Sequence, residues 1–172
     1  TDVFDALVYG EGEETITMLA DYVEGKISLA SIPNLIYRNN GEVLVTPIKR
    51  LEDLNDSPLP TYDESVYPAM RGDQKLRLAI VDESRGCPYS CNFCIHYGKS
   101  GNRWRTKAPE TVVAEMERMR TQYGISAFKF AGSNPPPALK KQIAETILRT
   151  GCKVSYTTFG HARGASEEDF SL

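Results

Sequence analysis

The sequence has no long apolar run, and none of its segments approaches the roughly 18 apolar residues that a membrane-spanning helix requires. It also lacks the charged segment followed by an apolar stretch that marks a secretory signal near an N-terminus. A strong net charge is absent too, because 20 basic and 23 acidic residues give a formal charge of −3. We therefore expect no membrane contact and a cytoplasmic location, and nothing indicates nucleic acid as a partner.

The composition is that of a globular protein. Apolar residues make up 41% and charged residues 25% of the 172 positions, which argues against disorder and against a disulfide-dominated miniprotein. This length corresponds to about one ordinary domain. The first residue is Thr1 rather than methionine, and we expect the chain to be a piece of a longer protein.

The first 75 residues show strand, helix and hairpin patterns and then lose their periodicity. A short apolar run at Ala6–Tyr9 precedes a glycine turn and an amphipathic helix that ends at Gly25. A hairpin is predicted around Asn39-Asn40-Gly41, because Asn and Gly tolerate the positive φ of tight turns. Prolines and acidic residues fill Pro47–Asp73, which we interpret as an extended surface linker.

The second half alternates strands with helices. The expected strands and helices are Leu76–Val81, a helix from Pro109 to Gly124, Ile125–Ala131, a helix over Leu139–Thr150, and Val154–Phe159. This alternation implies βαβ units, a parallel sheet and an α/β fold. On the last strand, Ser155, Thr157 and Phe159 share one face and are expected to line a barrel lumen.

Three of the four cysteines lie in one short segment, Cys87-Pro88-Tyr89-Ser90-Cys91-Asn92-Phe93-Cys94. Thiolates this close can converge on one metal centre, and soft sulfur favours an iron–sulfur cluster or zinc. Zinc would need a fourth ligand, for which His96 is available. A disulfide framework suits an odd triplet poorly, since the remaining cysteine is Cys152, which we interpret as a small buried apolar residue.

The segment from Arg85 to Lys107 contains five basic residues and no acidic one. A positive loop around thiolates is expected to screen an anionic metal centre. The alternative interpretation is an ordinary solvated basic loop.

The spacing C-x3-C-x2-C, with Phe93 directly before the third cysteine, resembles the hallmark of the radical S-adenosylmethionine (SAM) superfamily. The resemblance covers Leu76 to Leu172, about three βα units of a barrel that usually has six in this family. It implies a 4Fe–4S cluster held by Cys87, Cys91 and Cys94, with one iron open to the amino and carboxylate groups of SAM. Reductive cleavage of SAM would then yield a 5′-deoxyadenosyl radical, with an electron donor such as flavodoxin or ferredoxin.

The same resemblance implies further contacts with SAM or substrate. The candidates are Phe93, Gly132, Ser133, Asn134, His161 and Arg163. Phe93 is expected near the adenine. Residues 131–134 occupy the place of the family's Gly-Gly-Glu and lack its acid, while His161 and Arg163 follow the third strand at the end where barrel active sites assemble.

The N-terminal region resembles the end of the cobalamin-binding domain that precedes many radical SAM domains. The similarity rests on the strand and glycine turn of Asp5–Thr15, the hairpin at Ile32–Arg38 and the linker at Leu51–Pro60. It implies three regions: 1–30 as the end of a cobalamin-binding-like domain, 31–74 as hairpin and Pro-rich linker, and 75–172 as the N-terminal half of a partial barrel. The cobalamin-ligating histidine of that family belongs to a motif further upstream, so cobalamin is expected only in the full-length parent.

These patterns together predict an α/β fold, a partial (βα) barrel of the radical SAM type preceded by a βα tail, a hairpin and an extended linker. We interpret the chain as a fragment of a cobalamin-associated radical SAM enzyme that is inactive alone. Methyl transfer to an unactivated carbon is one use of its radical. Two alternatives stay open: a methylthiotransferase-like radical SAM protein, and a small metal-binding or electron-transfer module without SAM chemistry.

Overall fold

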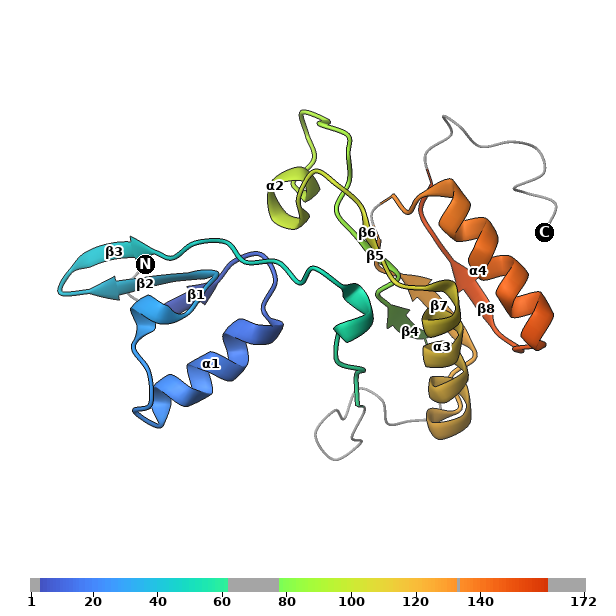
Figure 1. Ribbon diagram of the computed structural model, residues 1–172, viewed down its shortest axis with the longest axis horizontal. Coiled ribbons are helices and arrows are strands. Elements are labelled where there is room, and N and C mark those ends of the chain that lie inside the picture. The colour runs from blue at the N-terminus through green and yellow to red at the C-terminus, as the bar shows by residue number, and fades with distance from the viewer. Residues whose placement is uncertain (1–3, 62–77, 133, 161–172) are drawn as a thin grey trace. The chain divides into compact units, whose positions relative to one another are not determined.

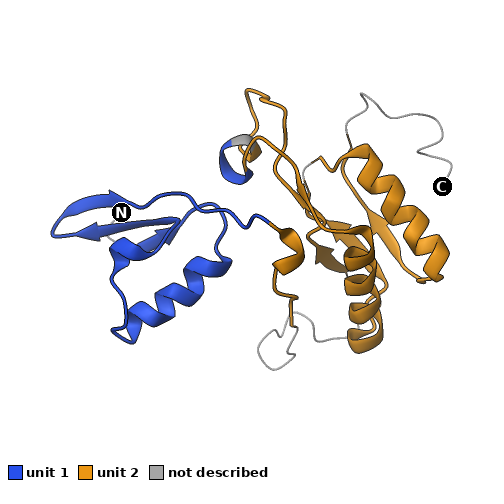
Figure 2. Cartoon of the chain, in the orientation of Figure 1, with its two compact units in different colours: residues 1–52, 98–100 blue, residues 53–97, 101–172 orange. Residues whose placement is uncertain are grey.

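The computed structural model describes residues 4–61, 78–132 and 134–160 (Figure 1). The chain divides into two compact units, residues 1–52 with 98–100 and residues 53–97 with 101–172 (Figure 2). Among the described residues, no helix combines the length and the apolar composition needed to cross a membrane.

The first unit is a three-stranded antiparallel sheet with one helix. Its elements are β1 (Ala6–Val8), α1 (Glu13–Val23), a 3-10 turn (Leu29–Ser31), β2 (Leu35–Asn39) and β3 (Glu42–Val45), with the strand order β1-β2-β3. Its core is built on the buried Ile32, Leu35 and Tyr37. Ala6 pairs with Tyr37, so the N-terminal strand and the hairpin share one sheet. The predicted domain boundaries at residues 30 and 74 stay a prediction.

The turn between β2 and β3 confirms the predicted hairpin. Asn40 and Gly41 occupy its two central positions, with φ angles of 48° and 87°. A two-residue turn with both central φ angles positive matches the right-handed twist of the flanking strands. Asn39 therefore pairs directly with Glu42 across the turn.

The second unit contains a parallel sheet of three strands covered by two helices. Its main elements are β4 (Leu78–Val81), α3 (Pro109–Tyr123), β7 (Ala127–Phe130), α4 (Pro137–Thr150) and β8 (Ser155–Thr157), with the strand order β4-β7-β8. Figure 1 shows α3 and α4 side by side against this sheet. The predicted α/β class and parallel sheet are confirmed.

The two long helices of this unit, α3 and α4, each begin at a proline and end before a glycine. Pro109 and Pro137 occupy the first turns of α3 and α4, where a missing N–H costs nothing. Gly124 and Gly151 follow the helices with φ of 67°, the left-handed conformation that favours glycine. Because Pro137 already has helical geometry, α4 begins two residues before the predicted Leu139.

The sheet buries one face and exposes the other. Ala79, Val81, Phe128 and Phe130 alternate along β4 and β7 and pack against the helices, with Met116, Met119 and Ile143 among the core residues on the helix side. Phe130 also stacks on Tyr156 of β8, with ring centroids 4.8 Å apart. The strand periodicity of two thus places the intervening side chains on the opposite, open face.

Candidate metal centre and cofactor site

Residues Cys87–Cys94, called here the cysteine loop, follow the C-terminal end of β4. The chain before and after the loop is joined by a short ribbon of two antiparallel strands, β5 (Ser84–Arg85) and β6 (Arg105–Thr106). The amide of Cys87 extends this ribbon by donating to the carbonyl of Gly101 at 3.1 Å. The ribbon fixes the base of the loop, and the sequence did not predict it because two-residue strands have no readable period.

All three cysteines of the loop carry free thiols, at different depths. Cys87 is buried with 8% of its surface exposed, Cys91 is exposed, and Cys94 is intermediate. A backbone hydrogen bond of 3.0 Å from the Cys94 amide to the Cys91 carbonyl folds the second half of the loop into a turn. The loop therefore presents one anchored and two accessible sulfur ligands.

The thiols do not converge in this structure. Within the described ranges, no set of three or more His, Cys, Asp or Glu side chains is close enough to hold a metal ion, and this includes His96 at the start of α2 (His96–Ser100). The chemistry of the donor set still fits an iron–sulfur cluster, since three soft thiols share one loop that contains no carboxylate. Ligation by Cys87, Cys91 and Cys94 stays a prediction.

The predicted contacts around the thiols are only partly described. Phe93 has 93% of its surface exposed, and its contact with adenine stays a prediction. Gly132 is buried at the C-terminal end of β7, and Asn134 is partly buried two residues later. Ser133, His161 and Arg163 lie outside the described residues.

Trp104, in the chain returning from the cysteine loop, makes two contacts that link this segment to the end of β7. Its indole nitrogen donates to the carbonyl of Asn134 at 2.8 Å. Its ring meets Tyr89 of the cysteine loop edge to face, with centroids 6.4 Å apart and an interplanar angle of 79°. No pattern in the sequence indicates this link, because Trp104 and Asn134 are 30 residues apart.

Glu83 lies just before β5, and it is fully buried. Its carboxylate accepts hydrogen bonds from the Gly132 amide at 3.1 Å and from the Ser84 hydroxyl at 3.0 Å. Burial raises the pKa of this carboxyl above its ordinary value, against the lowering effect of those hydrogen bonds. Glu83 belongs to no motif in the sequence, which indicates only that the loop after β7 lacks an acid.

Two basic residues of the segment from Arg85 to Lys107, which was expected to form a positive loop around the thiols, pair with acids outside it. Arg85 forms an ion pair with Asp82 at 2.6 Å, and Lys107 forms one with Glu115 of α3 at 2.5 Å. Lys107 and Glu115 have only 3% and 4% of their side-chain surfaces exposed. Acids outside the segment thus neutralise two of its five cations, and Lys107 lies inside the unit rather than on the loop surface.

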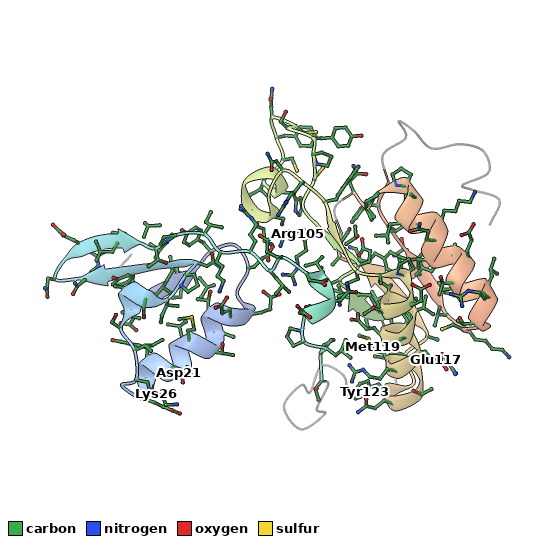
Figure 3. The ribbon with its side chains drawn as sticks, in the orientation of Figure 1. Asp21, Lys26, Arg105, Glu117, Met119 and Tyr123 are labelled. Carbon is green, nitrogen blue, oxygen red and sulfur yellow. The ribbon has the colours of Figure 1, made fainter. Side chains whose placement is uncertain are left out.

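Cys152 lies away from the cysteine loop, directly before β8 and therefore at the opposite edge of the parallel sheet. Its thiol, packed against the core, donates to the Glu117 carboxylate at 3.3 Å. Glu117 lies on α3 (Figure 3). Burial, and next the hydrogen bond to Glu117, raise the pKa of Cys152 to about 11. The interpretation as a small buried apolar residue is corrected: Cys152 is partly buried and hydrogen-bonded.

The open face of the sheet agrees with the predicted lumen face. Ser155, Thr157 and Phe159 are exposed there, opposite the helices. Lys129 of β7 shares the face, and its ammonium lies 5.3 Å from the centre of the Phe159 ring. Polar and cationic groups of β7 and β8 therefore line part of the side that a closed barrel would enclose, and the exposed Leu78 and Ile80 of β4 line the rest.

Known proteins resemble most of this chain. An uncharacterized methyltransferase of Pyrococcus horikoshii is 30% identical over 167 residues, which cover 95% of this chain and 36% of that protein. The anaerobic magnesium-protoporphyrin IX monomethyl ester cyclase of Synechocystis is 28% identical over 92% of this chain and 32% of the cyclase. The cobalamin-dependent radical SAM methyltransferase TokK of Streptomyces tokunonensis is 36% identical over 97 residues, 52% of this chain and 14% of TokK. The chain belongs to the radical SAM superfamily, in its cobalamin-associated branch.

The fold of this radical SAM chain is similar to that of a solved protein. The radical SAM methyltransferase TsrM from Kitasatospora setae, with cobalamin and a 4Fe–4S cluster bound, aligns with a TM-score of 0.71 and 20% identity. The alignment covers 97% of this chain and 36% of TsrM. No protein-family model matches the chain. The radical SAM chain spans about a third of the length of the curated relatives first compared.

Proposed function

We propose that the full-length protein is an enzyme that cleaves SAM reductively at a 4Fe–4S cluster held by Cys87, Cys91 and Cys94. The observation that carries this proposal is the position of three free thiols, spaced C-x3-C-x2-C, directly after the first strand of a parallel β/α sheet. When bound, the cluster supplies the electron that splits SAM into methionine and a 5′-deoxyadenosyl radical.

The residues of this chain hold and orient the reactants. The β5–β6 ribbon fixes the base of the cysteine loop, and the buried Cys87 anchors its first ligand position. Gly132 leaves room beside its backbone for the Glu83 carboxylate and the Ser84 hydroxyl, which pack there at the adjacent strand end. The exposed Ser155 and Thr157 offer hydroxyl groups to a substrate on the open face of the sheet.

Methyl transfer is the proposed use of the radical, supported by similarity to two proteins named as methyltransferases. Cobalamin would be held by a part of the parent protein outside this chain, since the histidine motif for it is absent here. The similarity to the cyclase favours a cyclisation as the second candidate reaction. A small redox protein such as flavodoxin or ferredoxin is the proposed electron donor, and the free thiols suit a reducing cytoplasm.

Anaerobic reconstitution of the full-length protein tests this function. We expect about four iron atoms per chain, a reduced cluster visible by electron paramagnetic resonance, and 5′-deoxyadenosine formed from SAM under reducing conditions. Cys91→Ala should lose the cluster and this product. Cys152→Ala is the matched control, because its thiol lies at the opposite edge of the sheet, and it should keep both.

Two results would contradict the proposal. One is a colourless wild-type protein that takes up zinc and never iron, which would favour a metal-binding module. The other is a Cys91→Ala variant that still holds a complete cluster, which would remove Cys91 from the ligand set.

A further inference from the structure

Glu83 lies at the junction of β4 and the cysteine loop, and its side chain is fully buried. Its backbone carbonyl accepts a hydrogen bond of 2.9 Å from the amide of Lys107, on the returning side of the ribbon. Its carboxylate accepts from the Gly132 amide and the Ser84 hydroxyl. One residue thus joins the outgoing strand, the returning strand and the end of β7.

The Glu83 carboxylate occupies space that is open only because residue 132 is a glycine. A Cβ at position 132 would overlap both the Glu83 carboxylate and the Ser84 hydroxyl, because those atoms fill the space beside the glycine. The hydrogen bond of 3.1 Å spans 49 residues of sequence. It therefore sets the position of the backbone after β7 relative to the base of the cysteine loop.

The Glu83 carboxylate has hydrogen-bond donors but, in the part of the chain that the structure describes, no cationic partner. Among the described residues, no basic side chain forms a salt bridge with Glu83, whereas the other buried acid of this unit, Glu115, is paired with Lys107. Burying a carboxylate without a cation is costly, and replacing it by an apolar residue would serve the fold at least as well. A buried acid at the functional edge of a sheet points to a role beyond stability.

Trp104 provides a second tether on the same backbone. Its indole nitrogen donates a hydrogen bond to the carbonyl of Asn134, and its ring contacts Tyr89 of the cysteine loop edge to face. Gly132 and Asn134 are therefore both held by residues that flank or contact the cysteine loop. Ligands of βα barrels bind at this C-terminal end of the strands.

We propose that Glu83 is a positioning residue for SAM: through the Gly132 amide it sets the backbone after β7 at the distance from the cysteine loop that SAM requires. The proposal rests on the proposed function. Glu83 acts through Gly132 and does not touch SAM, since none of its surface is exposed. Its loss should therefore weaken SAM binding and leave the cluster ligands in place.

The test uses the full-length holoenzyme with the variants Glu83→Ala and Glu83→Gln, and Glu110→Gln as the control. Glu110 is an exposed acid of α3 that is paired with Arg149 of α4 and makes no contact with Glu83 or Gly132 among those that the structure describes. All four proteins should hold the same iron and sulfide. The dissociation constant for SAM is read from the change that SAM causes in the electron paramagnetic resonance spectrum of the reduced cluster.

We expect Glu83→Ala to raise this dissociation constant by about tenfold, as when a buried amide donor loses its acceptor. The rate of 5′-deoxyadenosine formation at saturating SAM should change by less than about threefold, so that KM moves and kcat does not. Glu83→Gln should recover most of the affinity, because an amide oxygen still accepts from Gly132. Glu110→Gln should match the wild type.

Gly132→Ala provides an independent check, because its methyl group would displace the same carboxylate. It should weaken SAM binding as Glu83→Ala does. Unchanged SAM affinity in Glu83→Ala, or loss of the cluster in both Glu83 variants, would overturn the role of Glu83. A wild type without cluster or SAM cleavage would instead overturn the proposed function and this role with it.

Discussion

The buried ion pair between Lys107 and Glu115 makes a strong prediction about stability. The ammonium and the carboxylate are 2.5 Å apart, and almost none of either side chain is exposed. The Lys107 amide also donates to the Glu83 carbonyl. The ion pair therefore links the strand that returns from the cysteine loop to α3. Replacing only one partner would leave a charge in the interior without its counterion.

The size of the effect follows from that burial. Lys107→Met keeps the length and apolar stem of the side chain but leaves the Glu115 carboxylate unpaired, which costs about 3–5 kcal/mol. Glu115→Leu leaves the Lys107 ammonium without its counterion and should lower the free energy of unfolding by a similar amount. The double variant removes both charges, and its free energy of unfolding should return to within about 1 kcal/mol of the wild type or exceed it.

Urea unfolding followed by Trp104 fluorescence measures this cycle. Trp104 is the single tryptophan of the chain and lies in the same unit as the pair. With a urea dependence of about 2 kcal/mol per molar, each single variant should lower the midpoint by about 1.5–2.5 M. A loss below about 1 kcal/mol in Lys107→Met, or a double variant as unstable as the singles, would refute the reasoning.

Two further predictions concern a thiol and an amide. At pH 8 iodoacetamide should alkylate Cys152, whose pKa of about 11 compares with an ordinary 9.0, about a hundredfold more slowly than a reference thiol peptide. The rate, followed by mass spectrometry, should climb towards pH 11 and increase in Glu117→Gln; a rate equal to the peptide's contradicts this. Asn34→Asp should destabilise the first unit by about 2–3 kcal/mol, because the buried amide donates to the carbonyls of Glu11 and Lys49 at 2.7 and 2.8 Å. Thermal unfolding followed by circular dichroism checks this, and an unchanged transition would contradict it.

The elements that the sequence predicted are those whose signals are local. Pro109 and Gly124 mark the ends of α3 within a few residues, and the apolar periodicity between them indicates its buried face. Asn40 and Gly41 determine the hairpin turn by their own backbone preferences. The metal site could be predicted from the three clustered cysteines for the same reason, since their spacing places three ligands on one loop independently of distant contacts.

The surroundings of the thiols could not be predicted, because they depend on contacts between distant residues. The bond from Gly132 to Glu83 spans 49 residues and that from Trp104 to Asn134 spans 30. Neither glutamate nor tryptophan has a position in a periodic pattern that would reveal such a partner. The two-residue strands of the ribbon are also too short to show the alternation that identifies longer strands.

Charge counting along the sequence failed for a related reason. Five cations without an acid suggest a positive loop, but the count ignores which side chains the fold turns inward. Lys107 is buried against Glu115, and Arg85 is paired with Asp82, so neither contributes a free positive charge to the cysteine loop. The folded chain instead places a buried carboxyl group, that of Glu83, between β4 and the cysteine loop. Backbone amides and burial around the thiols therefore affect the electronic environment of a cluster at this loop as much as the basic residues between Arg85 and Lys107 do.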